Sequence, residues 1–220
     1  MEQPEILYED DVIIVVHKAS GVAVESGRVS EPDMVSILRA YLRTDYIGTI
    51  HRLDQPVEGI LVFGRTRQAA AGLSSQLKEG IFNKRYDVIS VTDKEDLPEE
   101  GRLTDRMDTD RKRNVSYITD PGGPGKEAVL EYRICRKWSA EEGGKLAHIK
   151  VDLFTGRRHQ IRLQLSHAGM PVLGDRKYGE TPAWYRGNIC LAASELSFLH
   201  PLSGEKMEYR ITPGFLKSVR

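Results

Sequence analysis

Ionisable side chains gather directly before an apolar segment early in the chain. His51, Arg52 and Asp54 precede a Gln-Pro turn, and residues 59–64 then read GILVFG. An apolar run bounded by turn residues predicts a buried strand, so the cluster is expected on a loop at the rim of the core. Taken alone, such a cluster is more typical of a salt-bridged surface loop than of an acid held ready for a substrate. The catalytic interpretation needs a second group that keeps Asp54 ionised and aimed.

A cationic segment, Thr155–Arg162 (TGRRHQIR), offers candidates for that second group. A helix is expected at about Arg158–Ala168, which puts Arg157, Arg158 and Arg162 on and around its first turns. Free backbone N–H groups at a helix N-terminus favour an anion. Residues four apart share one helical face, so Arg158 and Arg162 would make that face cationic. The alternative is a solvated cationic face, although like charges on one turn repel.

A tyrosine stands among basic residues in the segment 84–87, KRYD, at the start of a predicted strand. Tyr86 combines a ring on which a base can stack with neighbouring cations for phosphate, a combination typical of RNA contacts. Taken alone, the same residue is more typical of an ordinary strand.

Strands dominate the elements that the sequence predicts, and few helices separate them. One helix is expected after an N-cap at Ser30 with Pro32 in its first turn, and another from Thr66 to a stop at Gly80. Strands are expected at 6–8, 12–17, 59–64, 84–91, 115–119, 127–134, 147–153 and about 207–211, and loops at 93–100 and 120–125. This order favours an α+β fold, a mixed, largely antiparallel sheet flanked by helices, in one domain over residues 1–220.

The composition is that of an ordinary globular protein. Of the 220 residues, 40% are hydrophobic and 29% are charged, with 32 Lys+Arg against 32 Asp+Glu. No apolar run approaches the roughly 20 residues that span a bilayer, and the acidic N-terminus lacks the order of a signal peptide. Cys135 and Cys190 form no CxxC pair, so neither a disulfide framework nor a zinc site is expected. This use of cysteine predicts a cytoplasmic location.

Short motifs argue against several classes of enzyme. The segment 123–128, GPGKEA, fits a loose dinucleotide pattern only formally, because a strand-like run follows where a helix should begin. The sequence contains no GxxxxGK[ST] phosphate loop, no GxSxG elbow and no HExxH motif. His159 and His167 could bind a metal together with Asp54. The alternative is that both histidines are polar residues on a helix face.

Four segments in a fixed order carry a family resemblance. They are HRLD at 51–54, KRYDV at 84–88, TGRRHQIR at 155–162 and PVLGDRKYG at 171–179. Together with ILYEDDVIIVVHKASG at the start and LSFLHPLSGE near the end, they resemble the RluA-type pseudouridine synthase family over nearly the whole chain. Two departures stand out: Lys-Ala-Ser-Gly at 18–21 where the family usually has Lys-Pro-x-Gly, and Val-Glu-Gly at 57–59 where it has Thr-Ser-Gly.

The resemblance implies the pseudouridine synthase catalytic fold and the isomerisation of uridine to pseudouridine in structured ribosomal or transfer RNA, without cofactor or metal. It implies Asp54 as the catalytic aspartate, Tyr86 as the active-site tyrosine and Arg162 as the arginine paired with that aspartate. A target uridine must leave its stack before any side chain reaches C1′. The resemblance implies Arg52 as the side chain that fills the vacated space.

Other polar and charged side chains are expected to contact the RNA. They are His51, Arg157, Arg158 and the basic strip Arg111, Lys112 and Arg113, for which a solvated loop is the alternative. The catalytic fold is expected to start by Ile6, which leaves no separate N-terminal S4 RNA-binding domain. RNA is the expected partner, with no membrane and no obligatory protein partner, and a monomer is expected.

Two function classes compete with this interpretation. A non-catalytic RNA-binding protein or RNA chaperone on the same fold would have no need of Asp54, Tyr86 and Arg162. A metal-dependent hydrolase using His51, Asp54 and His159 would lose its activity on chelation.

Overall fold

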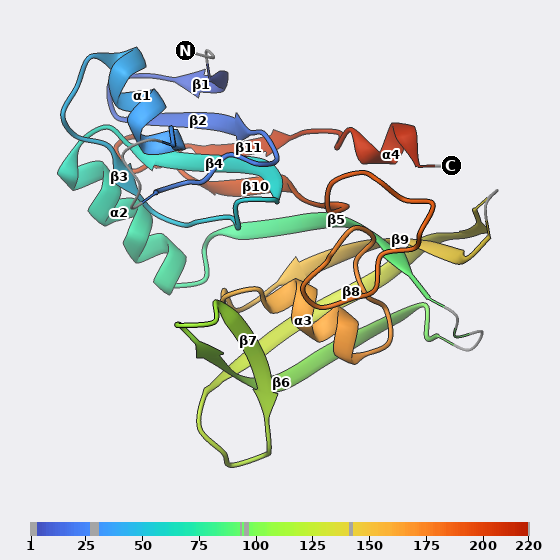
Figure 1. Cartoon of the computed structure of the whole chain (residues 1–220). Coiled ribbons are helices and arrows are strands. Elements are labelled where there is room, and N and C mark those ends of the chain that lie inside the picture. Colours follow the sequence, from blue (N-terminus) through green and yellow to red (C-terminus); the bar gives the residue numbers. More distant parts are fainter. Residues whose placement is uncertain (1–3, 27–30, 93, 95–96, 141–142, 220) are drawn as a thin grey trace. The chain divides into compact units, whose positions relative to one another are not determined.

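The computed structural model describes residues 4–26, 31–92, 94, 97–140 and 143–219. The chain divides into two compact units, one of Met1–Lys84 with Ala192–Pro213 and the other of Arg85–Leu191 with Gly214–Arg220 (Figure 1). Strands outnumber helices among the described elements, and the fold is α+β, as the sequence predicts. No described helix is long and apolar enough to cross a membrane. That the whole chain acts as one domain stays a prediction.

The first unit is built on a mixed sheet with two helices. Its strands β1, β2 and β4 pair antiparallel in that order, β4 pairs with β10 in parallel, and β10 pairs with β11 antiparallel. The short β3 pairs with the end of β4. The elements are β1 (Glu5–Glu9), β2 (Ile13–Lys18), α1 (Met34–Leu42), β3 (Gly48–Thr49), β4 (Glu58–Gly64), α2 (Arg67–Lys78), β10 (Leu191–Leu199) and β11 (Lys206–Arg210).

The core of this unit forms around β2 and β4, whose central residues are apolar on both faces. Residues 13–16 and 60–63 are all 0% exposed. Leu73 of α2 packs into the same cluster as Ile13 and Phe198. A close approach of α2 to β4 requires glycine at position 64, because a Cβ there would lie 2.6 Å from the backbone nitrogen of Ala70.

The second unit contains an antiparallel sheet with one main helix. The strand order is β5-β9-β8-β6-β7, and α3 contacts β6 and β7. The elements are β5 (Asn83–Val91), whose residues from Arg85 on belong to this unit, β6 (Glu100–Asp110), β7 (Val115–Thr119), β8 (Lys126–Ser139), β9 (Lys145–Leu153), α3 (Gln160–His167) and α4 (Phe215–Ser218).

The two faces of this second sheet differ in character, because side chains alternate along each strand. Val88, Ile149 and Leu130 are 0% exposed and lie on one face. On the other face, charged side chains pair across neighbouring strands. These pairs are Arg85 with Asp152, Lys150 with Asp87 and Arg102 with Glu131.

Both predicted helices of the first unit are present, with one start corrected. Thr66 caps α2 as predicted, since its side chain accepts the Ala69 amide at 3.1 Å, and α2 ends just before Gly80. The expected cap Ser30 lies outside the described residues, and Pro32 precedes the helix. Asp33 caps α1 instead, in a capping box with Ser36.

Two long strands, β6 and β10, were not predicted. The loop expected at 93–100 ends before Glu100, because Glu100 is the first residue of β6 and already pairs with Arg133 of β8. Strand β6 alternates exposed with half-buried residues only in its first half and carries six charged side chains among its eleven residues, so its apolar signal is weak. In segment 191–199, Leu191 is followed by three small residues, and the two alanines among them pair with Glu58 and Gly59 of β4.

Candidate active site

Asp54 lies on the loop that leads from β3 into β4 of the first unit. Its backbone carbonyl accepts a hydrogen bond from the Val57 amide at 3.0 Å, which makes a tight turn. The residues around it are buried, with Leu53 8% and Val57 3% exposed. These apolar anchors fix the backbone at Asp54, whose half-buried side chain lies at the rim of the core, as the sequence predicts.

A buried lysine clamps the residue that follows Asp54. Lys18 ends β2 and is 0% exposed. Its Nζ donates to the carbonyl oxygens of Ala19, Val22 and Gln55 at 3.1, 2.7 and 3.2 Å. Three acceptors match the three donors of an ammonium group, so the clamp uses the full bonding capacity of Lys18.

The segment 18–21 departs from the family pattern and still holds this loop. The Gly21 amide donates to the Gln55 carbonyl at 2.9 Å, and Gln55 Nε2 donates to the Gly21 carbonyl at 3.0 Å. Ser20 Oγ donates to the Pro56 carbonyl at 2.7 Å. The lysine and glycine that the pattern retains therefore make the clamp, and the departure at Ala19 removes none of these bonds.

Burial gives Lys18 a measurable effect on stability. Burial lowers the pKa of Lys18 from 10.5 to about 8, although the charges of Asp54 and Glu58 oppose the shift. Between these pH values the unfolded chain holds a proton that the folded chain has released, so the contribution of Lys18 to stability rises with pH. We expect the free energy of unfolding of the wild type, minus that of Lys18→Met, to grow by up to about 3 kcal/mol across this window. Denaturant titrations at several pH values measure it, and a flat difference would contradict the buried position.

His51 and Arg52 share the Asp54 loop but lie in different surroundings. The His51 ring meets the Phe82 ring edge-on with centroids 5.9 Å apart, and its Nε2 accepts the Val62 amide at 3.5 Å. The side chain of Arg52 is 67% exposed, and its Nη1 lies 3.3 Å from a carboxylate oxygen of Glu25. An exposed pair contributes at most about 1 kcal/mol, so Arg52 can readily exchange this partner for another. The RNA-contact roles of both residues stay predictions.

The surroundings of His51 make its charge state predictable. Burial, aided by the charge of Lys84, lowers the pKa of His51 to about 3. The ring is therefore neutral near neutral pH, and it can contact RNA only as a neutral group. We expect the His51 ring protons, assigned by their loss in His51→Gln, to show no NMR titration down to about pH 5, whereas a free histidine titrates near pH 6.5. A midpoint near 6.5 would contradict this prediction.

Tyr86 lies in β5 of the second unit, where the sequence predicts a strand. The residue is 6% exposed and pairs with Val151 of β9. Its ring shares a face with the buried Val88, because residues two apart in a strand point the same way. Its neighbour Arg85 points to the opposite face, where Nε lies 2.8 Å from Asp152. The catalytic role of Tyr86 stays a prediction.

Arg162 lies on α3 and is held by a buried carboxylate of the same unit. Its Nε and Nη2 donate to the two carboxylate oxygens of Asp175 at 2.8 and 2.7 Å, and the residues are 6% and 1% exposed. Burial alone would raise the pKa of Asp175, but the Arg162 guanidinium and the amides of Lys177 and Tyr178 hold it below its usual range. A bidentate pair fixes the guanidinium plane, so Asp175 orients Arg162.

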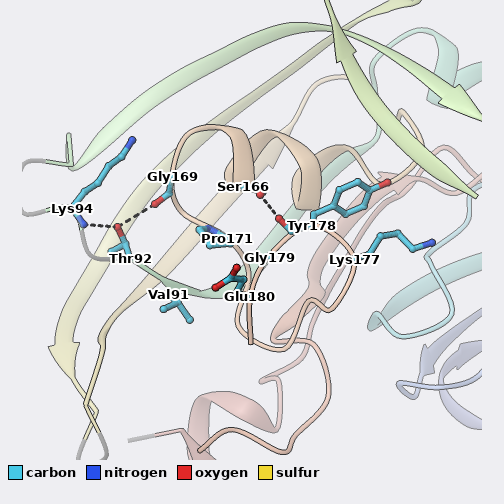
Figure 2. Close-up of a pocket in the computed structure, with 10 residues that line it drawn as sticks. All are labelled: Val91, Thr92, Lys94, Ser166, Gly169, Pro171, Lys177, Tyr178, Gly179 and Glu180. Carbon is cyan, nitrogen blue, oxygen red and sulfur yellow. Dashed lines mark hydrogen bonds between the residues drawn. The ribbon is translucent and has the colours of Figure 1, made fainter. Parts of the chain in front are cut away.

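Tyr178 completes this cluster around α3. The Arg162 guanidinium carbon lies 5.3 Å from the centre of the Tyr178 ring. Tyr178 Oη lies 2.6 Å from His159 Nδ1 and accepts the Ser116 amide at 2.7 Å. Ser166 Oγ donates to the Tyr178 carbonyl (Figure 2). Sequence reasoning gave neither Asp175 nor Tyr178 a role, although both stand in the segment 171–179 that carries the family resemblance.

The predicted cationic face on α3 is wrong. His159 adopts the left-handed conformation with φ 54°, and the helix begins only after it. Arg157 and Arg158 therefore precede the helix. Arg157 Nε donates to a backbone carbonyl of β8 at 2.7 Å, and Arg158 bonds a side chain of the β6–β7 turn. The spacing of four residues does not place Arg158 beside Arg162, because the helical path is broken between them.

The remaining predicted residues divide between the two units. Asp54, His51 and Arg52 belong to the first unit, and all the others belong to the second. The predicted pairing of Arg162 with Asp54 joins residues of different units and stays a prediction. Within the described ranges of the chain, no group of three or more His, Cys, Asp and Glu side chains gathers closely enough to hold a metal ion.

A cavity of about 670 Å³ opens in the second unit beside the C-terminal part of α3 (Figure 2). Lys94, Ser166, Lys177 and Tyr178 are among the residues that line it. Asp54, Tyr86 and Arg162 are not among its lining residues. The cavity is therefore distinct from the set of catalytic residues that the sequence predicts.

Comparison with known proteins gives a consistent family. The model of the RNA pseudouridylate synthase family matches residues 12–167. The dual-specificity RNA pseudouridine synthase RluA of Escherichia coli O157:H7 is 31% identical over 218 residues, which cover 96% of this chain and 93% of that protein. The ribosomal large subunit pseudouridine synthase C of Buchnera aphidicola subsp. Baizongia pistaciae is also 31% identical, over 89% of this chain, but the chain spans only 62% of that relative.

Solved structures agree on the fold. Human RNA pseudouridylate synthase domain containing 1 superposes with a TM-score of 0.81 at 22% identity, covering 100% of this chain and 87% of that one. Human RNA pseudouridylate synthase domain containing 4 superposes with a TM-score of 0.73 at 18% identity, covering 97% of this chain and 90% of that one. The family model covers well over half of the sequence, and it includes the segments that hold Asp54, Tyr86 and Arg162. The chain therefore belongs to the RNA pseudouridylate synthase family.

Proposed function

We propose that the protein is an RNA pseudouridine synthase, an isomerase that converts uridines to pseudouridines within structured RNA. The observation that carries the proposal is the family match over residues 12–167, which includes the HRLD, KRYDV and TGRRHQIR segments. The chain spans 62% of the length of the first two ribosomal large subunit synthases that it matches, so the activity of those whole proteins is a proposal here.

The reaction needs groups that act on one nucleotide without releasing it. The N1–C1′ bond of uridine breaks, a C5–C1′ bond forms, the C5 proton leaves and N1 gains a proton. Both halves must stay bound while the base turns, and a fixed site provides this by removing their freedom to separate. The buried turn around Asp54 and the bidentate hold on Arg162 support such a fixed site in each unit.

We assign roles to three residues within this reaction. Asp54 acts as the ionised carboxylate, either by attacking the sugar or base or by taking a ribose proton. Arg162 favours the ionised form of Asp54 and aims it. Tyr86 stacks on the detached base and assists removal of the C5 proton. Arg52, exposed and weakly paired, occupies the space that the flipped uridine leaves.

The RNA substrate follows from the names of the relatives. RluA of Escherichia coli is described as a dual-specificity RNA pseudouridine synthase, and other relatives as ribosomal large subunit synthases. We propose ribosomal or transfer RNA as the substrate class, a monomeric enzyme without an obligatory protein partner, and a cytoplasmic location.

The test is a direct assay for product. Purified protein is incubated with ribosomal and transfer RNA from cells that lack it, and pseudouridine is mapped chemically along each RNA. We expect new pseudouridine at defined positions. Absence of product on every cellular RNA, from folded protein that still binds RNA, would overturn the proposal in favour of a non-catalytic RNA-binding protein.

A further inference from the structure

The turn between β6 and β7 presents three consecutive cations on a fixed backbone. The carboxylate of Asp110 accepts the amides of Lys112 and Arg113 at 2.9 and 3.0 Å. Asn114 closes the turn with φ 55°, a left-handed conformation that asparagine tolerates better than most residues. The turn is therefore shaped by its own polar groups, and the side chains of Arg111, Lys112 and Arg113 are all exposed.

Asn114 also holds two cations from distant segments of the second unit. Arg158 Nη2 donates to Asn114 Oδ1, and Lys177 Nζ donates to the Asn114 carbonyl at 2.6 Å. Arg158 comes from the loop before α3 and Lys177 from the segment after it, and both are exposed. Two cations thus bond Asn114, and three more precede it directly in the turn. We call Arg111, Lys112, Arg113, Arg158 and Lys177 the turn cluster.

The charge of the turn cluster is poorly compensated. The acceptor that holds Arg158 on Asn114 is a neutral oxygen, which orients a cation without cancelling its charge. Arg113 lies 3.7 Å from the Asp110 carboxylate. Among the residues that the structure describes, neither Arg111 nor Arg158 forms an ion pair. Like charges held together repel one another, and an anion bound there relieves the repulsion.

The charged face of the second sheet provides the contrast. There each of three cations contacts a carboxylate on a neighbouring strand, at 2.8, 3.5 and 2.8 Å for Arg85 with Asp152, Lys150 with Asp87 and Arg102 with Glu131. The whole chain has a formal net charge of zero. The excess positive charge at the turn cluster is therefore a local feature.

We propose that the turn cluster is a docking surface for the phosphate backbone of RNA, and that Asn114 organises it. The choice of RNA among polyanions rests on the proposed function. Guanidinium and ammonium groups bind phosphate and release condensed counterions, so such a surface makes affinity depend on salt. None of its residues has a role in the chemical step assigned above. The surface therefore sets how tightly RNA is held, and catalysis on bound RNA does not need it.

The first experiment removes the two cations that bond Asn114 and compares that variant with a matched control. Binding of a purified transfer RNA pool is measured over a series of salt concentrations for wild type, Arg158→Gln/Lys177→Gln and Arg102→Gln/Arg210→Gln. Arg102 and Arg210 are exposed and lie 2.8 and 3.5 Å from their carboxylate partners, so the control loses the same charge elsewhere. We expect the first variant to bind about tenfold more weakly at low salt, with a salt slope shallower by about one to two. Equal slopes for both variants would overturn the proposal.

The second experiment changes the charge at the centre of the cluster without changing its shape. Asn114→Asp keeps the side-chain size and tolerates the left-handed conformation, but it places a carboxylate among the cations. We expect a higher midpoint of thermal unfolding and several-fold weaker RNA binding, two changes of opposite sign that a purely structural role would not produce. Unchanged RNA affinity would contradict the proposal.

Failure of this proposal is distinguishable from failure of the proposed activity. The same preparations are assayed for pseudouridine. Product formation with unaltered salt slopes would overturn the docking surface and retain the enzyme. Shallower slopes for the turn-cluster variant without any product in wild type would retain RNA docking and overturn the activity.

Discussion

Replacement of Asp54 by alanine is expected to lower pseudouridine formation at least about a thousandfold, which corresponds to about 4 kcal/mol in activation free energy. The proposed reaction has no second carboxylate to take over a step at C1′. RNA affinity should change by less than about threefold, because removing one negative charge does not weaken phosphate contacts. Single-turnover assays with saturating enzyme separate the chemical step from binding.

The control for this variant is Asp11→Ala, which removes an exposed acid from the same unit. It should leave both turnover and RNA affinity unchanged. Residual turnover of Asp54→Ala within about tenfold of wild type, or about 1.4 kcal/mol, would refute the assigned role. Stability should fall little, since the turn at Asp54 is held by its backbone carbonyl and by the buried side chains around it.

The elements that the sequence predicts correctly have local signals. Strand β4 is an unbroken apolar run and lies buried on both faces, and α2 begins at a threonine cap that bonds the amide three residues on. Both signals are contained within a dozen residues. The loop with Asp54 follows from the same reasoning, because a proline turn before an apolar strand places the cluster at the edge of the core.

The features that the sequence did not predict depend on contacts between distant residues. In the sequence, Asp175 is one acid in a segment rich in cations. Its role in orienting Arg162 depends on a contact between the segment after α3 and the helix itself, which the sequence does not show. The start of α3 was misplaced because the left-handed backbone of His159 is stabilised by Tyr178, nineteen residues later. Spacing along the chain shows which residues share a helix face only where the helix is unbroken.

Each unit fixes its own share of the proposed catalytic groups by a different device. In the first unit, Lys18 holds the loop through three backbone carbonyls. These bonds do not depend on which side chains the loop carries, so those side chains can serve the reaction. In the second unit, Asp175 holds Arg162 through its side chain, so the guanidinium that is proposed to act on Asp54 also helps to hold the fold. Variants of the second device therefore mix stability with activity, and a single substitution cannot separate the two.

Asp175→Asn is expected to cost about 3 kcal/mol or more in the free energy of unfolding. Removing one partner of a buried ion pair typically costs about 3–5 kcal/mol, because the other charge stays buried without compensation. Turnover should fall as well, since the guanidinium loses its bidentate partner and its fixed plane. Denaturant unfolding and the pseudouridine assay measure the two effects on the same preparation. Stability within about 0.5 kcal/mol of wild type would contradict the buried pair.

The double variant Arg162→Met/Asp175→Leu separates the structural role from the catalytic one. Replacing a buried ion pair by apolar residues of similar volume is often neutral or stabilising, so its free energy of unfolding should recover to within about 1 kcal/mol of wild type. Turnover should stay as low as in the Asp175→Asn variant or fall further, because no guanidinium remains to favour the carboxylate of Asp54. A stable double variant that makes pseudouridine at the wild-type rate would show that Arg162 only holds the fold together. A stable double variant without product would instead assign the guanidinium to the reaction, because the fold would then be intact without it.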